Sequence, residues 1–291
     1  MYKIIFIDID GTLRDNKRNL SQKTIDTIKK VTDEGIFVVL CSGRPRKYTE
    51  EISRKCFASK YIITSNGANI YDYKENKILY SNIMDKKALI QLYNIAIQEN
   101  ARFIMDVGEH RVVNIVKHPE REEKLEGKIE DFVYNHDVVQ CIIADEDFYK
   151  IKKLVPQIDK LEKVEIKNRH KSLTDPNYPR TDTIYCDVGN IGSNKGNAVQ
   201  KLCKYLTIDL KDAIAIGDSF NDLSMFEKVG YSVAMGNANE EIKEKANEVT
   251  LSNEDDGVAV FLEKLLNHEF ILQNSQFTNI IKKIKNKCNK K

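Results

Sequence analysis

Short apolar segments alternate with amphipathic helical segments at both ends of this 291-residue sequence, and this alternation constrains the fold more than any other feature. The predicted N-terminal elements are strands at 3–7, 36–40 and 61–64 and helices at 22–34 and 46–55. Ser21 is placed to cap the first helix, and Gly35 is placed to end it. Strand–helix–strand order is typical of a parallel sheet with helices on both faces.

The same alternation resumes near the C-terminal end. The predicted elements there are a helix from 194 to about 206, a strand at 213–216, a helix at 223–229, a strand at 231–234, and helices at 240–246 and 258–266. We therefore expect an α/β fold in which the two ends of the chain form one doubly wound, mostly parallel, Rossmann-like sheet.

The middle of the sequence differs in character. A predicted hairpin at 69–81 leads into helices at 86–99 and 146–158 and strands at 102–105, 111–115, 138–144, 164–167 and 183–187, with a charged, ambiguous stretch between them. This mixture predicts an inserted α+β domain at residues 84–183, whereas residues 1–83 and 184–270 form the first domain. Residues 271–291 are left as a basic tail.

Composition excludes several classes of protein. The formal net charge of +2, with 31% charged and 41% hydrophobic residues, indicates a globular chain with a mixed surface, so neither a nucleic-acid nor a membrane partner is expected. No run of eighteen apolar residues and no N-terminal signal pattern is present, so a cytoplasmic location is predicted. The six cysteines lack a Cys-x-x-Cys motif, and we expect small buried side chains.

The tail allows two interpretations. Phe277, Ile280, Ile281 and Ile284 recur at helical spacing, and six lysines follow between Lys282 and Lys291. A short basic amphipathic helix could attach to a membrane surface or an acidic partner. A solvated terminus is the interpretation we favour.

Two acids leave the first predicted strand in the sequence Asp8-Ile9-Asp10-Gly11-Thr12. A buried carboxylate requires compensation, and a divalent cation is a usual partner. Because parallel strands of α/β sheets present their ligands at their carboxyl ends, this position favours an active site. A solvated Asp-Gly turn is the alternative.

Three later segments have similar placement. Ser42-Gly43-Arg44 follows a strand, and its hydroxyl and backbone N–H could bind a phosphoryl oxygen, although Ser-Gly is also common in turns. Lys195 stands at a helix start, where the macrodipole disfavours a cation, so an anion is expected nearby unless the lysine is solvated. Asp218 and Asp222 follow another strand; a helix cap needs one acid, and this loop has two. All four segments should converge on one edge of the sheet.

The four segments, in this order, resemble the haloacid dehalogenase-like (HAD) superfamily, whose signature is Asp-x-Asp-Gly-Thr, Ser or Thr, Lys, and Gly-Asp-x-x-x-Asp. The chain is similar in particular to the Cof-type sugar-phosphatase group (subfamily IIB) over about residues 2–267. The segments that carry this closer resemblance are 64–68, 193–196, 217–246 and 256–259. The inserted domain resembles the cap of that group, which sets substrate specificity, by position and length only.

The resemblance implies a division of roles between the first two acids. Asp8 is expected to be the nucleophile that forms an aspartyl-phosphate. Asp10 is expected to protonate the leaving group and then deprotonate water, with its carboxyl held away from the metal. Mg²⁺ would be held by Asp8, the backbone carbonyl of Asp10, and Asp218.

The remaining core residues would bind and support the phosphoryl group. The expected phosphoryl-binding groups are Lys195, Ser42, the Gly43 N–H and Asn221, with Arg44 facing the substrate. Thr12 and Asp222 are expected to support the metal ligands and to orient Lys195. Substrate choice should depend on further polar residues, for which the candidates are Arg44, Asn66, His110, Arg111, His118, Arg169 and His170. Each histidine is individually more typical of a surface or loop position.

The sequence thus predicts an Mg²⁺-dependent phosphatase that hydrolyses a small phosphorylated metabolite, as a monomer or homodimer. Asp10 disfavours dehalogenation, because the resemblance implies that dehalogenases lack this acid. A phosphomutase needs the same residues and stays open as an alternative. A catalytically silent phosphate-binding regulator is the alternative from a different class.

Overall fold

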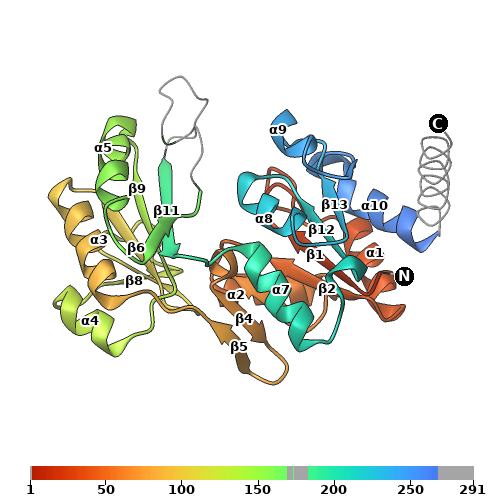
Figure 1. Ribbon diagram of the computed structural model, residues 1–291, viewed down its shortest axis with the longest axis horizontal. Helices are drawn as coiled ribbons and strands as arrows, with labels where there is room; N and C mark the ends of the chain where they lie inside the picture. The colour runs from red at the N-terminus through yellow and green to blue at the C-terminus, as the bar shows by residue number, and fades with distance from the viewer. Residues whose placement is uncertain (1, 169–172, 174–182, 268–291) are drawn as a thin grey trace, which may run out of the picture.

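Two β-sheets dominate the structure, a computed structural model that describes residues 2–168, 173 and 183–267. The eight-stranded sheet has the strand order β14-β13-β12-β1-β2-β3-β4-β5, and the six-stranded sheet has the order β10-β11-β9-β6-β7-β8. Figure 1 shows the two sheets side by side, each with its own helices. The predicted α/β fold class, with a mostly parallel sheet and an inserted α+β portion, is confirmed.

The eight-stranded sheet combines the two ends of the chain. Its parallel strands are β1 (Ile4–Asp8), β2 (Phe37–Cys41), β3 (Tyr61–Thr64), β12 (Ala213–Gly217), β13 (Tyr231–Ala234) and β14 (Glu248–Val249). The predicted hairpin is present as the antiparallel strands β4 (Asn69–Asp72) and β5 (Lys77–Ser81). Because strand order runs outward in both directions from β1, this strand marks the topological switch point where α/β sheets bind ligands.

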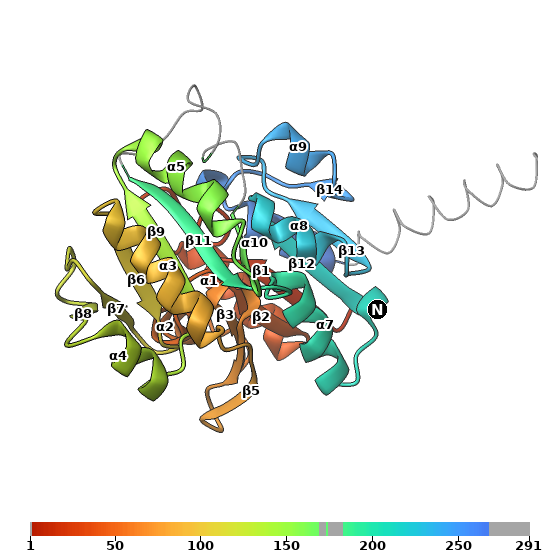
Figure 2. The same ribbon diagram turned by 60° about the vertical axis from the view of Figure 1, so that its left-hand side comes forward.

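Helices cover both faces of this sheet because β1 is apolar on both sides. Ile5 and Ile7 pack in the cluster that includes helices α1 (Gln22–Asp33), α2 (Arg46–Lys55) and α10 (Gly257–Leu266). Ile4 and Phe6 pack on the opposite side, with α7 (Lys195–Tyr205), α8 (Leu223–Phe226) and α9 (Glu240–Lys243). Figure 2 shows α7 and α8 on the near side of the sheet. Each such fully buried side chain contributes about 1.5–3 kcal/mol, which fixes β1 at the centre.

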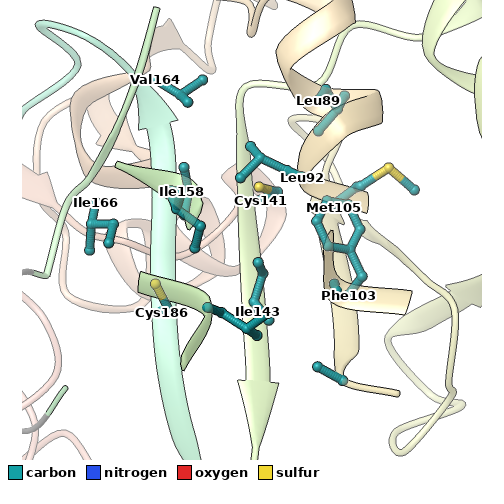
Figure 3. Packing of buried hydrophobic residues seen from close by; sticks show 14 of the residues in the cluster. Leu89, Leu92, Phe103, Met105, Cys141, Ile143, Ile158, Val164, Ile166 and Cys186 are labelled. Atoms are coloured by element: carbon teal, nitrogen blue, oxygen red, sulfur yellow. The ribbon is translucent and has the colours of Figure 1, made fainter. Parts of the chain in front are cut away.

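The six-stranded sheet is built from the middle of the chain. Its strands are β6 (Arg102–Asp106), β7 (Arg111–Val113), β8 (Glu122–Lys124), β9 (Gln140–Asp145), β10 (Val164–Ile166) and β11 (Ile184–Asn190). Helices α3 (Lys86–Gln98), α4 (Ile129–Asn135) and α5 (Phe148–Ile158) pack on one face. Figure 3 shows how alternate residues of β6, β9 and β11, such as Phe103, Ile143 and Cys186, point into this apolar layer.

The other face of the six-stranded sheet is polar at the end near the first sheet. Asp106, Gln140 and Asp187 alternate with the helix-facing residues of their strands, and they contact Ser65 and Asn66 of the eight-stranded part through hydrogen bonds. The strand period of two residues therefore separates an apolar packing face from a polar face that meets the edge of the other sheet.

The predicted boundary at residue 184 needs a correction. The prediction counted the strand at 183–187 among the elements of the middle but placed the domain boundary at its start. Because β11 pairs with β9 and β10 in the six-stranded sheet, the boundary belongs after this strand. Its alternating pattern identified a strand but carried no information on which sheet it joins. The return connection follows Asn190, and Asn82 of the outgoing connection ties the two together by a 2.6 Å bond to Ser193 Oγ.

Local differences from the prediction fall in short or charged segments. The ambiguous stretch contains β8 and α4, each too short to show a clear period. The predicted helices at 223–229 and 240–246 end earlier, at Phe226 and Lys243. Ser21 caps α1 as expected, since its hydroxyl accepts the backbone N–H of Thr24.

The described cysteines are buried, as expected, and Cys288 lies outside the described residues. Within the described ranges, no helix has both the length and the apolarity needed to cross a bilayer. The predicted basic tail, residues 271–291, also lies outside the described residues.

Gly196 lies where α7 packs closely against α8. A Cβ at this position would clash with the backbone carbonyl oxygen of Ser224, which cannot rotate away. We expect Gly196→Ala to lower the free energy of unfolding by about 1–3 kcal/mol, as overpacking does. Gln200→Ala, at an exposed position of the same helix, should change it by less than about 0.5 kcal/mol in the same denaturant titration. Equal stabilities for the two variants would contradict the close approach.

Candidate active site

Strand register brings the predicted site residues to one edge of the eight-stranded sheet. Asp8 pairs with Cys41, so Ser42 follows directly beside it. Ile7 pairs with Ile216, so the loop that begins at Asp218 leaves the sheet on the other side of Asp8. Three segments distant in sequence thereby converge because their parallel strands end at the same level.

Lys195 forms the centre of the site. Its ammonium bonds to Asp8 Oδ1, and it donates to Asp222 Oδ1 at 2.7 Å. The side chains of Lys195 and Asp222 are 0% exposed, and that of Asp8 is 9% exposed. The expectation of an anion beside this lysine is confirmed, and two anions are present. Asn194 caps α7 and places the lysine at its first residue, since its side chain accepts the N–H of Asn197 at 2.8 Å.

Asp222 organises the loop after β12. Its second oxygen accepts the backbone N–H groups of Asp218 at 3.1 Å and Ser219 at 3.0 Å. Thr12, from the loop after β1, donates to Asp218 Oδ1 at 2.7 Å. Both oxygens of Asp222 are therefore occupied by protein donors, whereas Thr12 orients Asp218 toward the first loop.

Asp10 is paired with Arg44 and not with Lys195. Arg44 Nε donates to Asp10 Oδ2 at 2.9 Å, and the guanidinium of Arg44 lies 5.3 Å from the ring centroid of Tyr48. Burial opposes the charged form of Arg44, but the nearby Asp10 carboxylate prevails and raises the arginine pKa. The carboxyl group of Asp10 is thus held by the second loop of the site.

The cluster holds more acids than cations. Burial raises the pKa of Asp8 well above its ordinary value, and the neighbouring Asp222 and Asp218 oppose the favourable effect of Lys195. Burial and Asp222 likewise raise the pKa of Asp218 from 3.8 to about 7. One lysine cannot neutralise three carboxylates, so the site favours either added protons or an added cation.

The donor set fits a hard divalent cation. Oxygen atoms of Asp8, Asp218 and Asp222 lie within 4.8 Å of one another. Carboxylate oxygens are the ligands that Mg²⁺ prefers, and crowded carboxylates are what such an ion stabilises. The carboxyl of Asp10 lies outside this group and accepts from Arg44. Asp222 lies in the group, although both its oxygens already have protein partners.

The expected phosphoryl-binding residues Ser42, Gly43 and Asn221 follow β2 and β12, the two strands that flank β1. Ser42 is buried, and its hydroxyl accepts the N–H of Arg44 at 3.1 Å, which leaves its own hydrogen to donate. Asn221 donates to Asn66 Oδ1 at 3.0 Å and retains a second N–H. A Cβ at Gly43 would come within 3.1 Å of the Asn66 carboxamide, so the glycine permits close packing of these loops.

Arg111 is the candidate from the six-stranded sheet that the structure brings near the site. Burial lowers its pKa, although Asp106 and Asp187 favour its charged form. Its Nε is buried and has no hydrogen-bond partner. Burial raises the pKa values of Asp106 and Asp187 in turn. These groups form a polar interface above the phosphoryl-binding residues.

Other candidates lie elsewhere. His110 and His118 are about half exposed and pair with Glu123 and Glu120, so they are surface residues of the six-stranded part. Arg169 and His170 lie outside the described residues. Sequence reasoning missed three polar residues of the six-stranded sheet: Asp106, Gln140 and Asp187. Only their alternation with apolar neighbours could have indicated them, and it does not reveal which face meets the core.

Comparisons with known proteins agree with this geometry. The sequence pattern of the haloacid dehalogenase-like hydrolases matches residues 5–262. The phosphatase YwpJ of Bacillus subtilis is 30% identical over 289 residues, which cover 91% of this chain and 100% of that protein. The 5-amino-6-(5-phospho-D-ribitylamino)uracil phosphatase YwtE of the same organism is 30% identical, with 92% and 99% coverage.

A solved structure extends the similarity to the fold. The crystal structure of a haloacid dehalogenase-like hydrolase from Bacteroides thetaiotaomicron superposes with a TM-score of 0.79, at 25% identity, and covers 91% of this chain and 100% of that one. The chain therefore belongs to the haloacid dehalogenase-like hydrolase family, and it is a phosphatase of that family. The resemblance inferred from the four motifs is confirmed.

Because the site holds more acids than cations, we expect the stability of the metal-free protein to fall as the pH rises. Because the folded-state pKa of Asp218 is raised, the folded protein without metal holds a proton that the unfolded chain releases above about pH 4. Its unfolding free energy should fall between about pH 4 and 7, and Mg²⁺ should stabilise it more at pH 8 than at pH 5. Melting temperatures in EDTA and in Mg²⁺ measure both effects.

Asp218→Asn provides the matched control, because it removes the titrating group and keeps the side-chain size. The difference in melting temperature between wild type and this variant at each pH reports the titration of Asp218. It removes the contribution of acids with lowered pKa values, such as Asp72, which change stability at lower pH. A wild-type Mg²⁺ stabilisation that does not depend on pH would argue against the charge imbalance.

Proposed function

We propose that this chain is an Mg²⁺-dependent phosphatase that hydrolyses a small phosphorylated metabolite through an aspartyl-phosphate on Asp8. The observation that carries the proposal is the buried Lys195, which holds Asp8 and Asp222 while the carboxyl of Asp10 is held separately by Arg44. Two acids two residues apart thus have different environments, as a nucleophile and a general acid require.

Asp8 attacks phosphorus in line with the ester oxygen. Lys195 holds Oδ1, so Oδ2 is the attacking atom, and the P–O ester bond breaks as the new bond forms. Lys195, the Ser42 hydroxyl, the Gly43 N–H and the remaining N–H of Asn221 stabilise the equatorial oxygens. These donors are fixed before the reaction, because they lie on strand ends and helix α7.

Asp10 transfers the protons. Arg44 holds one of its oxygens, and the other donates a proton to the departing alkoxide. Asp10 then accepts a proton from the water that attacks the phosphorus of the intermediate. Cleavage of the bond between Asp8 and phosphorus releases phosphate and restores the Asp8 carboxylate and the protonated Asp10.

Asp8, Asp218 and the backbone carbonyl of Asp10 would hold the Mg²⁺. When bound, the ion neutralises charge on the phosphoryl oxygens and on the crowded carboxylates. Thr12 and Asp222 keep these ligands in place through the bonds that they make to the side chain and backbone of Asp218.

The proposed domain division follows from the same geometry. Residues 1–83 and about 191–270 would form the catalytic core, and the inserted part between them would form a cap that selects the leaving group. One relative is named for a phosphoribitylamino-pyrimidine, so phosphorylated polyols and sugars are the first compounds to screen. Cytoplasmic location and the monomer or homodimer state stay predictions.

Turnover of p-nitrophenyl phosphate tests the class of reaction. We expect steady hydrolysis with Mg²⁺, none in EDTA, and a loss of at least about 10³-fold in Asp8→Asn, since no other group forms the covalent bond. Binding of phosphate without turnover would instead favour the silent regulator. Interconversion of hexose phosphates with a bisphosphate activator would favour the mutase.

A leaving-group series tests Asp10. Asp10→Asn should lower kcat by roughly 10²–10⁴-fold with an alkyl phosphate, whose alkoxide needs a proton. The loss in formation of the intermediate should be smaller with p-nitrophenyl phosphate, whose phenolate leaves unprotonated, and burst kinetics measure that step. Equal losses in that step for both substrates would contradict the role of Asp10 as general acid.

A further inference from the structure

Asn66 lies where the two parts of the molecule meet. Its carboxamide donates through Nδ2 to Gln140 Oε1 at 2.8 Å and to Asp187 Oδ2 at 3.3 Å, both in the six-stranded sheet. Its Oδ1 accepts from Asn221 Nδ2 at 3.0 Å, on the loop after β12. The side chain is 3% exposed, and every hydrogen on Nδ2 has a partner.

The backbone holds this side chain in an unusual position. Ser65, Asn66 and Gly67 have successive positive φ values of 51°, 53° and 89°. The Asn66 N–H donates to the Ser42 carbonyl at 3.0 Å, which joins this turn to the second loop of the site. A Cβ at Gly67 would clash with the carbonyl oxygen of Asn194, so the turn also packs on the start of α7. Backbone strain of this kind persists where surrounding contacts hold it, commonly at functional sites.

The hydrogen bonds have a fixed direction. The Asp187 carboxylate only accepts, so Asn66 must present Nδ2 to the six-stranded sheet and Oδ1 to Asn221. Asn221 must then present its own Nδ2 to Asn66, while its Oδ1 accepts from Ser219 Oγ at 2.6 Å. One acid of the six-stranded sheet thereby sets which end of the Asn221 carboxamide faces the site.

The same amides border the space beside the catalytic lysine. A cavity of about 100 Å³ separates the two parts at this point. Asn66, Lys195 and Asn221 line it, and Lys167 contributes from the inserted part. The orientation of the Asn221 carboxamide therefore decides whether a donor or an acceptor meets an anion bound beside Lys195.

We propose that Asn66 is a positioning residue that couples the inserted part to the phosphoryl-binding site, because Asp187 orients Asn66 and Asn66 orients Asn221. Docking of the inserted part against Asn66 then directs the Asn221 N–H group toward the phosphoryl oxygens. The inference rests on the proposed function, since it assigns Asn221 to phosphoryl binding. It adds a route by which the inserted part affects chemistry without contacting the phosphoryl group.

Exchanging the amide and the acid between positions 66 and 187 tests the coupling. Asn66→Asp keeps the size and tolerates positive φ, but it places a carboxylate against Asp187. Repulsion between the two carboxylates should displace the side chain at position 66, and with it the acceptor that orients the Asn221 amide. We therefore expect kcat for p-nitrophenyl phosphate to fall roughly tenfold to a hundredfold, the effect of one lost hydrogen bond to a charged group. Adding Asp187→Asn restores a donor opposite the new acceptor, so the double variant should recover most of kcat.

Two controls separate positioning from folding and from metal binding. Asn100→Asp makes the same substitution at an exposed residue with φ of 52°, and it should leave kcat and the melting temperature unchanged. The Mg²⁺ concentration for half-maximal activity should be the same in all variants, because Asn66 bonds to none of the three clustered acids. If Asn66→Asp does not fold, Asn66→Gly, which keeps the left-handed backbone, should lose kcat without rescue by Asp187→Asn.

Three results would each overturn the inference. The first is wild-type kcat in a folded Asn66→Asp variant, and the second is failure of Asp187→Asn to restore activity to that variant. The third is wild-type kcat in Asn66→Gly. These results are distinct from a failure of the proposed function. Full activity in Asp8→Asn would refute the nucleophile and leave the comparison between the Asn66 and Asp187 variants unaffected.

Discussion

The buried ammonium of Lys195 between Asp8 and Asp222 is the interaction on which the rest of the site depends. Its charge offsets part of the cost of burying carboxylates at the end of a central strand. Asp222 uses its other oxygen to shape the loop that carries Asp218. Removing the lysine would leave a buried cluster of like charges, so Asp8, Lys195, Asp218 and Asp222 form one electrostatic unit.

The eight-stranded sheet brings the charged groups of this electrostatic unit together. Strands β1, β2 and β12 are buried and end at the same level, so the loops after them need no long reach to meet. The inserted part meets the same edge through Ser65 and Asn66, whose left-handed backbone fits between three loops of the site. The ends of buried strands thus hold the charged groups of the site in place, and a strained turn makes the contacts to the other sheet.

The sequence was informative wherever a local pattern had one physical meaning. The strand–helix alternation predicted the parallel sheet, and Lys195 at a helix start indicated a nearby anion. The face of a short strand and its partner sheet are not local properties, so the domain boundary was placed before β11 instead of after it, and Asp187 was missed. The short, charged elements β8 and α4 depend on tertiary contacts that no local period reveals.

Mass spectrometry of the trapped intermediate tests the central claim most directly. Trypsin releases residues 4–14 as one peptide, in which Asp10→Asn leaves Asp8 as the only acid. After rapid acid quench of this variant during turnover, we predict that the peptide carries one phosphoryl group at Asp8 and that hydroxylamine removes it. A hydroxylamine-stable phosphoryl group, or one on a different peptide, would contradict the assignment of Asp8 as the nucleophile.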